Sequence, residues 1–312
     1  MKQGCVGCAQ GRQDLTVAAR ERDIRVIRFN QDDFPRQACI QWRSGGQTLF
    51  LFDEHCFSED EISGAWFRRA PHPLTGQDQT SYFTTRETAG YLKGVWETTT
   101  WTWLNLPSAI ARAEHKLAQL RCAQQLGFTI PDTLATNCPE AARHFARNRD
   151  IVAKTVVGSG LVINDIDHAI FTTRVAPEDL SADSAIQACP IIFQNRIRTQ
   201  FDLRVTVVGS QIFAARIIVR DRTEMDVDWR KIDPARVYYQ RHLLPRELEA
   251  KCSKLVAAFD LMYGALDFVV TSEGEHVFLE LNPTGQWGWI ERALKMPITN
   301  AILDTLVGNC RA

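Results

Sequence analysis

The sequence predicts an α/β protein built from two or three packed subdomains. The chain has 312 residues, of which 45% are hydrophobic and 23% charged, so it can bury a large core. Short apolar runs separated by turn residues predict several strands, and longer stretches show the periodicity of amphipathic helices. No internal repeat or low-complexity tract is evident in the sequence.

The first third of the chain is predicted to be a small α/β domain. Its expected strands and helix are Arg25–Phe29, Ala38–Trp42, Thr48–Phe52 and Thr84–Glu97. The segment Asn105-Leu106-Pro107-Ser108 interrupts this pattern. We therefore expect a domain boundary near residue 106.

Helices and hairpin strands are predicted for the rest of the chain. A stretch rich in Ala, Leu, Arg and Gln predicts one helix at Ala109–Leu126, which ends at Gly127. The spacing of the next apolar runs is typical of an antiparallel sheet with its tightest turn at Gly209-Ser210. These runs are Ile151–Val157, Ala169–Val175, Pro190–Ile197, Leu203–Val208 and Ile212–Val219. A helix and two further strands follow at Pro245–Phe259, Ala265–Val270 and His276–Leu281.

Composition limits the classes of partner. Thirty-six basic and 37 acidic side chains leave a net charge of -1, so no electrostatic argument favours nucleic acid or an anionic membrane as partner. No apolar run has the length of a signal peptide or of a transmembrane span, so we expect a cytoplasmic protein. The nine cysteines are odd in number and scattered, which predicts reduced thiols. Cys5 and Cys8 form a C-x-x-C pair, but without a second pair they predict neither a zinc ribbon nor a redox site.

The sharpest chemical signal is a set of oxygen donors on two predicted neighbouring strands. Glu280 and Asn282 are two residues apart and so project to the same side of one strand, while Asp267 lies on the other strand across a short turn. Two carboxylates and an amide oxygen suit Mg²⁺, which takes its remaining ligands from water and phosphate. The alternative is that these residues are only polar groups near strand ends.

Two lysines and a small-residue loop are candidates for phosphate binding. Lys154 lies inside an apolar strand and is followed by Gly158-Ser159-Gly160, whose backbone N–H groups can closely approach phosphate oxygens. Lys116 lies in the predicted helix that follows the first domain. Taken singly, these residues are better explained as an ordinary hairpin loop and two solvated lysines, and only the wider pattern favours phosphate binding.

Asp202 and Arg204 share one side of a predicted strand, where they would bind ribose and phosphate, or simply pair with each other. Arg216 and Arg220 share one side of the next strand. Arginines placed opposite the metal carboxylates would hold a substrate carboxylate or the transferring phosphate.

In this order along the chain, the signals resemble the ATP-grasp superfamily over residues 100 to 295. More narrowly, Trp103-Leu104-Asn105-Leu106-Pro107, Ile130-Pro131-Asp132-Thr133 and Asn282-Pro283-Thr284-Gly285-Gln286-Trp287 are similar to segments of the microviridin-type graspetide maturases. The resemblance implies an ATP-grasp fold with α+β lobes. Its parts would be an N-terminal α/β domain (1–106), a central lobe (107–189) and a C-terminal lobe with the metal site (190–312).

The resemblance also implies roles for individual residues, with ATP and Mg²⁺ as cofactors. Lys116, Lys154 and Ser159 would contact ATP phosphates, the strand from Gln194 to Ile197 would meet adenine, and Asp202 would accept a hydrogen bond from ribose. Asp267, Glu280 and Asn282 would hold Mg²⁺, and Arg204 and Arg216 would stabilise the transferring phosphate. The sequence departs from the family's usual pattern at Asn195, where many relatives have Glu, and at His115, where Asn is commoner.

The activity implied is macrocyclisation of a ribosomally made precursor peptide. A Glu or Asp side chain of an acidic core would be activated as an acyl-phosphate and joined to a Ser or Thr hydroxyl or a Lys amine, with a leader segment as recognition element and a homodimer as the assembly. Two alternatives remain: a ligase that adds a free amino acid to a small acid or protein tail, and an inactive ATP-grasp module that binds peptide or nucleotide.

Overall fold

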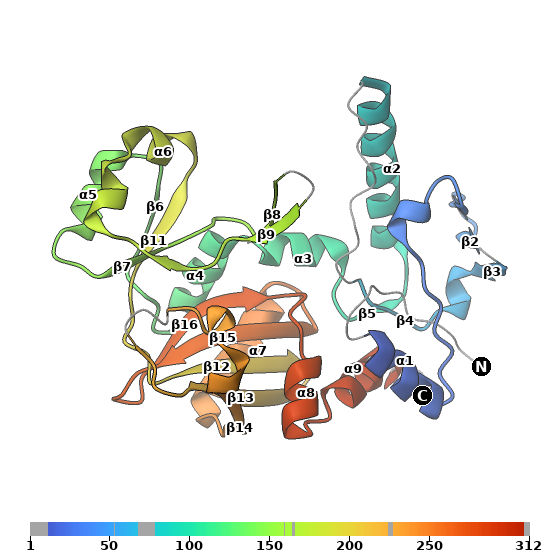
Figure 1. Cartoon of the computed structure of the whole chain (residues 1–312). Helices are drawn as coiled ribbons and strands as arrows, with labels where there is room; N and C mark the ends of the chain where they lie inside the picture. The colour runs from blue at the N-terminus through green and yellow to red at the C-terminus, as the bar shows by residue number, and fades with distance from the viewer. Residues whose placement is uncertain are drawn as a thin grey trace.

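The computed structural model describes residues 12–52, 54–67, 79–158, 160–163, 166–223 and 227–308. These residues form an N-terminal part and two lobes, each with its own sheet (Figure 1). Cys5 and Cys8 lie outside the described residues, so the prediction about that pair stays a prediction. None of the described helices has the length and hydropathy needed to cross a bilayer.

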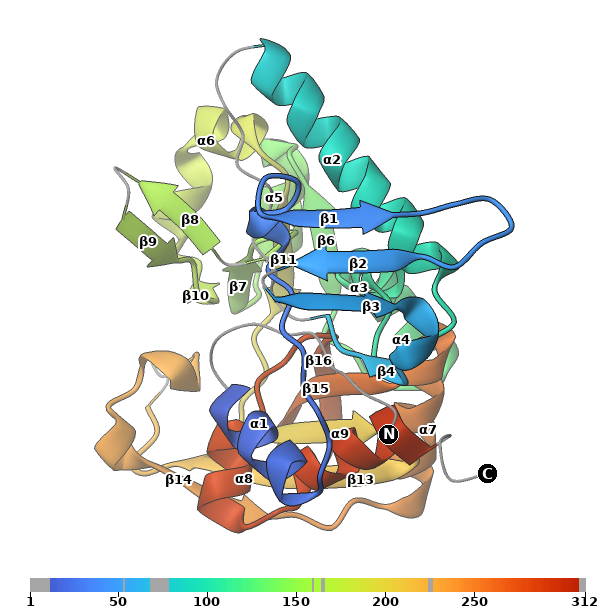
Figure 2. The same cartoon turned by 90° about the vertical axis from the view of Figure 1, so that its right-hand side faces the viewer.

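The N-terminal part is a three-stranded antiparallel sheet with one long helix across it, as Figure 2 shows. Its main elements are β1 (Ala38–Gln41), β2 (Leu49–Phe52), β3 (His55–Ser58) and α2 (Gln79–Thr98). The shorter ones are η1 (Gln31–Asp33), η2 (Glu59–Glu61), β4 (Gly64–Ala65) and β5 (Thr102–Trp103). Residues of β1 alternate between buried and exposed, as expected of a strand with one face on a core. That core is aromatic: the ring of Phe50 stacks on Trp96 and on Phe57.

The predicted strand at Arg25–Phe29 is wrong, because no strand of the structure contains these residues. Ile27 and Phe29 are buried in the aromatic core, so their apolar side chains reflect packing rather than a strand ladder. The preceding helix α1 (Arg12–Glu21) packs against α9 (Ile298–Val307), and Arg22 forms an ion pair with Asp304 at 2.6 Å. The N-terminal part is thereby attached to the C-terminal lobe.

The central lobe is a small antiparallel sheet in the order β10-β7-β11-β6, with helices beside it. Its strands are β6 (Thr133–Thr136), β7 (Ile151–Lys154), β10 (Thr173–Arg174) and β11 (Ile191–Asn195), with a separate hairpin of β8 (Gly160–Ile163) and β9 (Ile166–Ala169). Its helices are α3 (Pro107–Ala113), α4 (Lys116–Gln125), α5 (Pro139–Ala146), η3 (Pro177–Ser181) and α6 (Asp183–Ala188). The predicted boundary at residue 190 falls just before β11, although β11 pairs with β6 and β7.

The C-terminal lobe is a five-stranded antiparallel sheet in the order β14-β13-β12-β15-β16. Its strands are β12 (Phe201–Val208), β13 (Gln211–Val219), β14 (Val237–Arg241), β15 (Tyr263–Val270) and β16 (His276–Asn282). Its helices are η4 (Trp229–Lys231), η5 (Pro234–Arg236), α7 (Arg246–Ala258), α8 (Gly288–Leu294) and α9. One face of the sheet packs on α7, α4 and α3, and part of the other packs on α8 and α9.

The apolar runs between 151 and 219 form strands of two different sheets rather than one. The predicted hairpin is confirmed: β12 and β13 pair up to Val208 and Gln211, which leaves Gly209 and Ser210 as the loop. Gly209 has φ 55°, a conformation that favours glycine.

The single helix predicted at Ala109–Leu126 is two helices. The chain leaves the helical conformation at His115 (φ -76°, ψ 96°) and re-enters it at Lys116. Gly127 ends α4 with φ 76°, as its glycine predicts. The break places Lys116 at the start of α4.

Candidate active site

A cavity of about 320 Å³ lies between the central sheet and the C-terminal sheet. It is lined by nine of the residues that the sequence marked: Lys116, Lys154, Gln194, Ile197, Asp202, Arg204, Asp267, Glu280 and Asn282. Ser159 lies outside the described residues, although its neighbour Gly158 lines the cavity. Arg216 is not among the lining residues.

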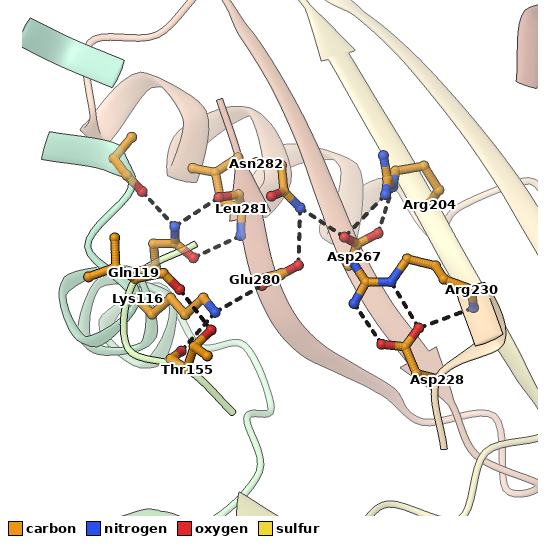
Figure 3. Close-up of polar contacts among 12 residues, drawn as sticks. Lys116, Gln119, Thr155, Arg204, Asp228, Arg230, Asp267, Glu280, Leu281 and Asn282 are labelled. Carbon is orange, nitrogen blue, oxygen red and sulfur yellow. Dashed lines mark hydrogen bonds and ion pairs between the residues drawn. The ribbon is translucent and has the colours of Figure 1, made fainter. Parts of the chain in front are cut away.

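The three predicted metal ligands converge on one face of the C-terminal sheet (Figure 3). Asn282 Nδ2 donates to Asp267 Oδ2 at 2.9 Å and to Glu280 Oε1 at 3.2 Å. Because the amide atoms of Asn282 can exchange places by a half-turn, its oxygen can face the same point. Within the described residues, no group of three or more His, Cys, Asp or Glu side chains is arranged to hold a metal, so a cation here would have two carboxylates and an amide.

A register shift in β16 makes this convergence possible. Phe268 of β15 pairs with Phe278 of β16, and Asp267, the residue before Phe268, pairs with Glu280. Leu279 is therefore an extra residue in β16. Without that bulge Glu280 would point to the opposite face of the sheet, because side chains alternate along a strand. The bulge therefore brings Glu280 to the face of Asp267.

Arg204 holds Asp267 from the neighbouring strand. The two residues are paired in the register of β12 and β15. Arg204 Nε donates to Asp267 Oδ1 at 2.6 Å, and a terminal guanidinium nitrogen donates to Oδ2 at 3.3 Å. The guanidinium carbon lies 5.9 Å from the ring centroid of Trp289. Burial raises the pKa of the Asp267 carboxyl, an effect that Arg204 opposes and Glu280 reinforces.

Two lysines approach Glu280 from the central lobe. Lys116 Nζ donates to the carbonyl of Thr155 at 2.9 Å and lies 3.9 Å from Glu280 Oε2. Burial lowers the pKa of both lysines, and Glu280 opposes that shift. Burial disfavours ionisation of Glu280 as well, yet Lys154 and Lys116 hold the pKa of that carboxyl below its usual value. Burial in the cavity thus disfavours the charged form of both lysines. A bound polyphosphate would stabilise that charged form.

Asp202 is buried on the same face of the sheet, but it is already paired. Arg222 donates to its Oδ2 at 2.7 Å. Burial raises the pKa of Asp202 to about 6, although Arg222 opposes the shift. A hydrogen bond from ribose to Asp202 must therefore be made beside this arginine or replace it.

Unsatisfied acceptors mark the inner wall of the cavity. Gln194 Nε2 donates to Thr133 Oγ1 at 2.9 Å. Within the described part of the chain, neither Gln194 Oε1 nor Asn195 Oδ1 meets a donor, although both atoms are buried. A ligand with N–H donors, such as the amino group of a nucleotide base, would satisfy them.

Arg216 does not join the site, which corrects the prediction made from its place on the strand. Arg216 pairs with Leu203, whereas Arg204 pairs with Ala215. Paired residues share one face of an antiparallel sheet, so Arg216 points to the face opposite Arg204. There its Nε donates to His242 Nδ1 at 2.7 Å, and its guanidinium carbon lies 4.6 Å from the ring centroid of Phe201.

The sequence interpretation missed Asp228 and Arg230, which also line the cavity. Arg230 donates to both carboxylate oxygens of Asp228, at 2.8 and 2.6 Å, as Figure 3 shows. Its guanidinium lies 5.4 Å from the ring of Phe171, which belongs to the central lobe. The triplet Asp228-Trp229-Arg230, with opposite charges on either side of an aromatic ring, is the signal that could have indicated this contact between lobes.

The segment after β16 is fixed by hydrogen bonds beside the predicted metal ligands. Asn105 Nδ2 donates to the carbonyls of Tyr263 and Pro283 at 2.8 and 2.7 Å, and its Oδ1 accepts from the Tyr263 N–H at 3.0 Å. The Tyr263 hydroxyl donates to the Gly285 carbonyl at 2.7 Å. A Cβ at Gly285 would lie 2.5 Å from the Cβ of Ala265, so the segment leaves no space for a side chain there. Asn105, which the sequence placed at the predicted domain boundary, therefore fixes the backbone next to Asn282.

Known structures give the family of this fold and site. No protein-family model matches the chain, and no curated protein sequence matches it. The macrocyclase MdnC from Microcystis aeruginosa MRC, solved with precursor peptide MdnA, is 30% identical over 98% of this chain and 100% of its own, with a TM-score of 0.86. A RiPP-associated ATP-grasp ligase from Chryseobacterium gregarium, solved with ADP and a leader and core peptide, is 29% identical over 99% and 97% of the two chains, also with a TM-score of 0.86.

A third structure shares the fold at lower identity. The ATP-grasp ligase PsnB, in complex with a phosphomimetic precursor variant, Mg and ADP, is 21% identical over 100% of this chain and 99% of its own, with a TM-score of 0.77. The predicted fold class, α/β with ATP-grasp lobes, is confirmed by these matches. With 30% identity to MdnC along the full length of both chains, this protein belongs to the ATP-grasp ligases that macrocyclise ribosomally made precursor peptides.

Proposed function

We propose that the cavity binds ATP with Mg²⁺ and that the protein uses it to join acidic side chains of a precursor peptide to hydroxyl or amine side chains of the same peptide. The observation that carries this proposal is the convergence of Asp267, Glu280 and Asn282 at 2.9 and 3.2 Å beside Lys116. Two carboxylates and an amide oxygen suit Mg²⁺, and the adjacent lysines suit the phosphates that share its coordination shell.

In the first step, a Glu or Asp carboxylate oxygen of the peptide attacks the γ-phosphorus of ATP, and ADP leaves. Lys116 and Lys154 would neutralise the phosphate oxygens, and Arg204 would orient Asp267 and balance the charge of the incoming carboxylate. Asp267, Glu280 and Asn282 would hold Mg²⁺, which would supply positive charge against the phosphate during the transfer. The product is an acyl-phosphate.

In the second step, a Ser or Thr hydroxyl or a Lys amine attacks the acyl carbon, phosphate leaves and the nucleophile loses its proton. The ring closes through an ester or an amide. Water must stay out of the cavity until then, since an acyl-phosphate hydrolyses. The contact of Arg230 with Phe171 joins the two lobes beside the cavity and supports that exclusion.

Base recognition would use the unsatisfied acceptors. Gln194 Oε1 and Asn195 Oδ1 lack donors within the described residues, and Ile197 lines the same cavity. The departure at Asn195 therefore leaves an acceptor in place, although it is shorter than Glu. From the resemblance, we also propose a leader segment and an acidic core in the peptide, a homodimer, and a cytoplasmic location; sedimentation velocity would test the assembly.

The decisive experiment incubates the purified protein with ATP, Mg²⁺ and a small acidic peptide encoded beside its gene. We expect ADP release that depends on the peptide and a loss of about 18 Da of peptide mass per ring formed. Mild base would reverse the mass change for esters and leave amides intact. ADP release that depends instead on a free amino acid, without ring formation, would favour the amino-acid ligase. Nucleotide binding without any ADP release would identify an inactive module.

A further inference from the structure

Gln119 makes a set of contacts that joins the two lobes directly behind the metal ligands. It belongs to α4, and its side chain is 2% exposed. Its Oε1 accepts from the Leu281 N–H at 2.8 Å, and its Nε2 donates to the Leu281 carbonyl at 2.8 Å and to the Ala113 carbonyl at 2.5 Å. Figure 3 shows the carboxamide facing the backbone of Leu281.

The position of Leu281 gives these contacts their significance. Leu281 lies between Glu280 and Asn282 in β16, and β16 is an edge strand of the sheet. Leu281 is aligned with Leu266 of β15, but in an antiparallel pair the N–H and C=O of alternate residues point away from the neighbouring strand. The Leu281 N–H and C=O are of this outward kind, since both bond to Gln119. The carboxamide of Gln119 supplies one acceptor and one donor, as a neighbouring strand would. It therefore holds the backbone between the two ligands of β16.

The same side chain also spans the helix break that precedes Lys116. Lys116 lies three residues before Gln119, so both project from neighbouring positions on α4. The bond to Ala113 ties down the end of α3 across the helix break, and this break sets where Lys116 begins α4. One buried carboxamide thus connects the end of α3, the lysine-bearing helix and the strand that carries two of the oxygen donors.

We propose that Gln119 is a positioning residue for the metal and phosphate site. It fixes the separation of Lys116 from Glu280 and the directions of Glu280 and Asn282, without touching the nucleotide or the metal. The proposal rests on the proposed function, since it assigns Gln119 to the assembly of the same site. A side chain that only stabilised the fold would affect unfolding but leave metal binding by the folded protein unchanged.

The test compares Gln119→Leu and Gln119→Glu with two controls. Gln119→Leu removes all three hydrogen bonds at similar size, whereas Gln119→Glu keeps an acceptor for the Leu281 N–H and removes both donors. Gln125→Leu is the first control, because it replaces glutamine by leucine at an exposed position of the same helix. Leu92→Ala, in α2 and in the aromatic core of the N-terminal part, lowers stability in a cluster that does not include Leu281.

The readout is Mn²⁺ binding to each folded protein in the presence of ADP, followed by electron paramagnetic resonance. We expect Mn²⁺ affinity to fall roughly ten- to a hundredfold in both Gln119 variants, as it does when partners of metal ligands are removed, and to stay unchanged in both controls. Amide hydrogen exchange at Leu281 should accelerate in Gln119→Leu only. In Gln119→Glu the retained acceptor should protect that amide while Mn²⁺ binding still weakens.

Either Gln119 variant that is folded and binds Mn²⁺ with ADP as the unmodified protein does would overturn the inference. If Gln119→Leu does not fold, Gln119→Glu alone decides the question in the same way. A fall in Mn²⁺ affinity in Leu92→Ala equal to that in Gln119→Glu would also overturn it, since loss of stability would then explain both. Failure of the unmodified protein to bind Mn²⁺ with ADP at all would instead contradict the proposed function.

Discussion

Arg204 and Arg216 lie on adjacent strands of the same sheet, yet their side chains lie on opposite faces of it and have different partners. Arg204 faces the cavity and donates to both oxygens of Asp267. Arg216 faces the other side, where it donates to His242 and lies over Phe201. Both arginines sit within hydrophobic strands, so residue type and local sequence do not distinguish them.

The difference arises from strand register. Pairing of Leu203 with Arg216 and of Ala215 with Arg204 assigns the two guanidinium groups to different faces. A shift of one residue would exchange them, because the side-chain period of a strand is two. The bulge at Leu279 has the same kind of effect on Glu280. The site is therefore defined by register as much as by motif, and the following predictions test that conclusion.

The largest effect is expected on the cavity face from Asp267→Asn. The substitution keeps the shape of the side chain but removes a charge that binds Arg204 and would bind Mg²⁺. We expect peptide-dependent ADP release to fall roughly 10³-fold, with the thermal unfolding transition retained. Macrocyclisation near the normal rate would show that Asp267 is not a metal ligand.

Arg204→Ala and Arg216→Ala form a matched pair across the sheet. We expect Arg204→Ala to lower kcat/KM for the peptide roughly 10²-fold, because it removes charge stabilisation inside the cavity. Arg216→Ala should change kcat/KM less than about threefold, since its partners lie on the other face. Equal losses in two variants that remain folded would contradict the assignment of the two faces.

Arg230 should have an intermediate effect, because it contacts the opposite lobe as well as the cavity. Its removal leaves the buried carboxylate of Asp228 without its bidentate partner. We expect Arg230→Ala to lower kcat/KM roughly tenfold. Lys231→Ala is the control, because Lys231 Nζ lies 5.3 Å from the same Phe171 ring, whereas among the described residues the ion pair to Asp228 is made by Arg230 and not by the Lys231 side chain. A loss as large in Lys231→Ala would indicate that the ring contact, rather than the ion pair, matters.

The smallest effect concerns the face that carries Arg216. Burial, together with Arg216 and His276, lowers the pKa of His242 from 6.5 to about 4. Between pH 6.5 and about 4 the imidazole of His242 binds a proton in the unfolded chain but not in the folded chain. Protonation therefore favours the unfolded chain in this range, so the stability that the protein has above pH 6.5 decreases as the pH falls towards 4. We expect His242→Gln to flatten the dependence of the melting temperature on pH in that range, whereas His115→Gln, at an exposed position, should not. An unchanged slope in His242→Gln would contradict the pKa shift.

The sequence indicated the elements and the order of the site better than their mutual placement. The hairpin at Gly209-Ser210 and the end of α4 at Gly127 followed from glycine conformation, and the hydrophobic face of α7 followed from its periodicity. The trio of oxygen donors was also indicated, since two of its members are two residues apart on one strand.

The remaining features depend on contacts between segments far apart in the chain. Nothing local predicts that the helix at Ala109–Leu126 breaks before Lys116, because the break contains neither glycine nor proline and is stabilised by Gln119. Arg25–Phe29 has the pattern of a strand but finds its partners in a core rather than a ladder. The bulge at Leu279 and the face of Arg216 are properties of strand pairs, and a single strand does not reveal them.

The close approach of Gly285 to Ala265 has a consequence for how sequences of this family can diverge. Gly285 has no left-handed backbone angle that would demand glycine, so crowding excludes a side chain there: a new Cβ would lie 2.5 Å from the Cβ of Ala265, its tightest contact, and 3.3 Å from the Cβ and the carbonyl oxygen of Asn282. The two positions should therefore vary together: a lineage that gains a methyl group at position 285 must give one up at position 265. The two side chains would thus share one small volume, and an exchange of glycine and alanine between the two positions would keep the total number of methyl groups in that volume the same.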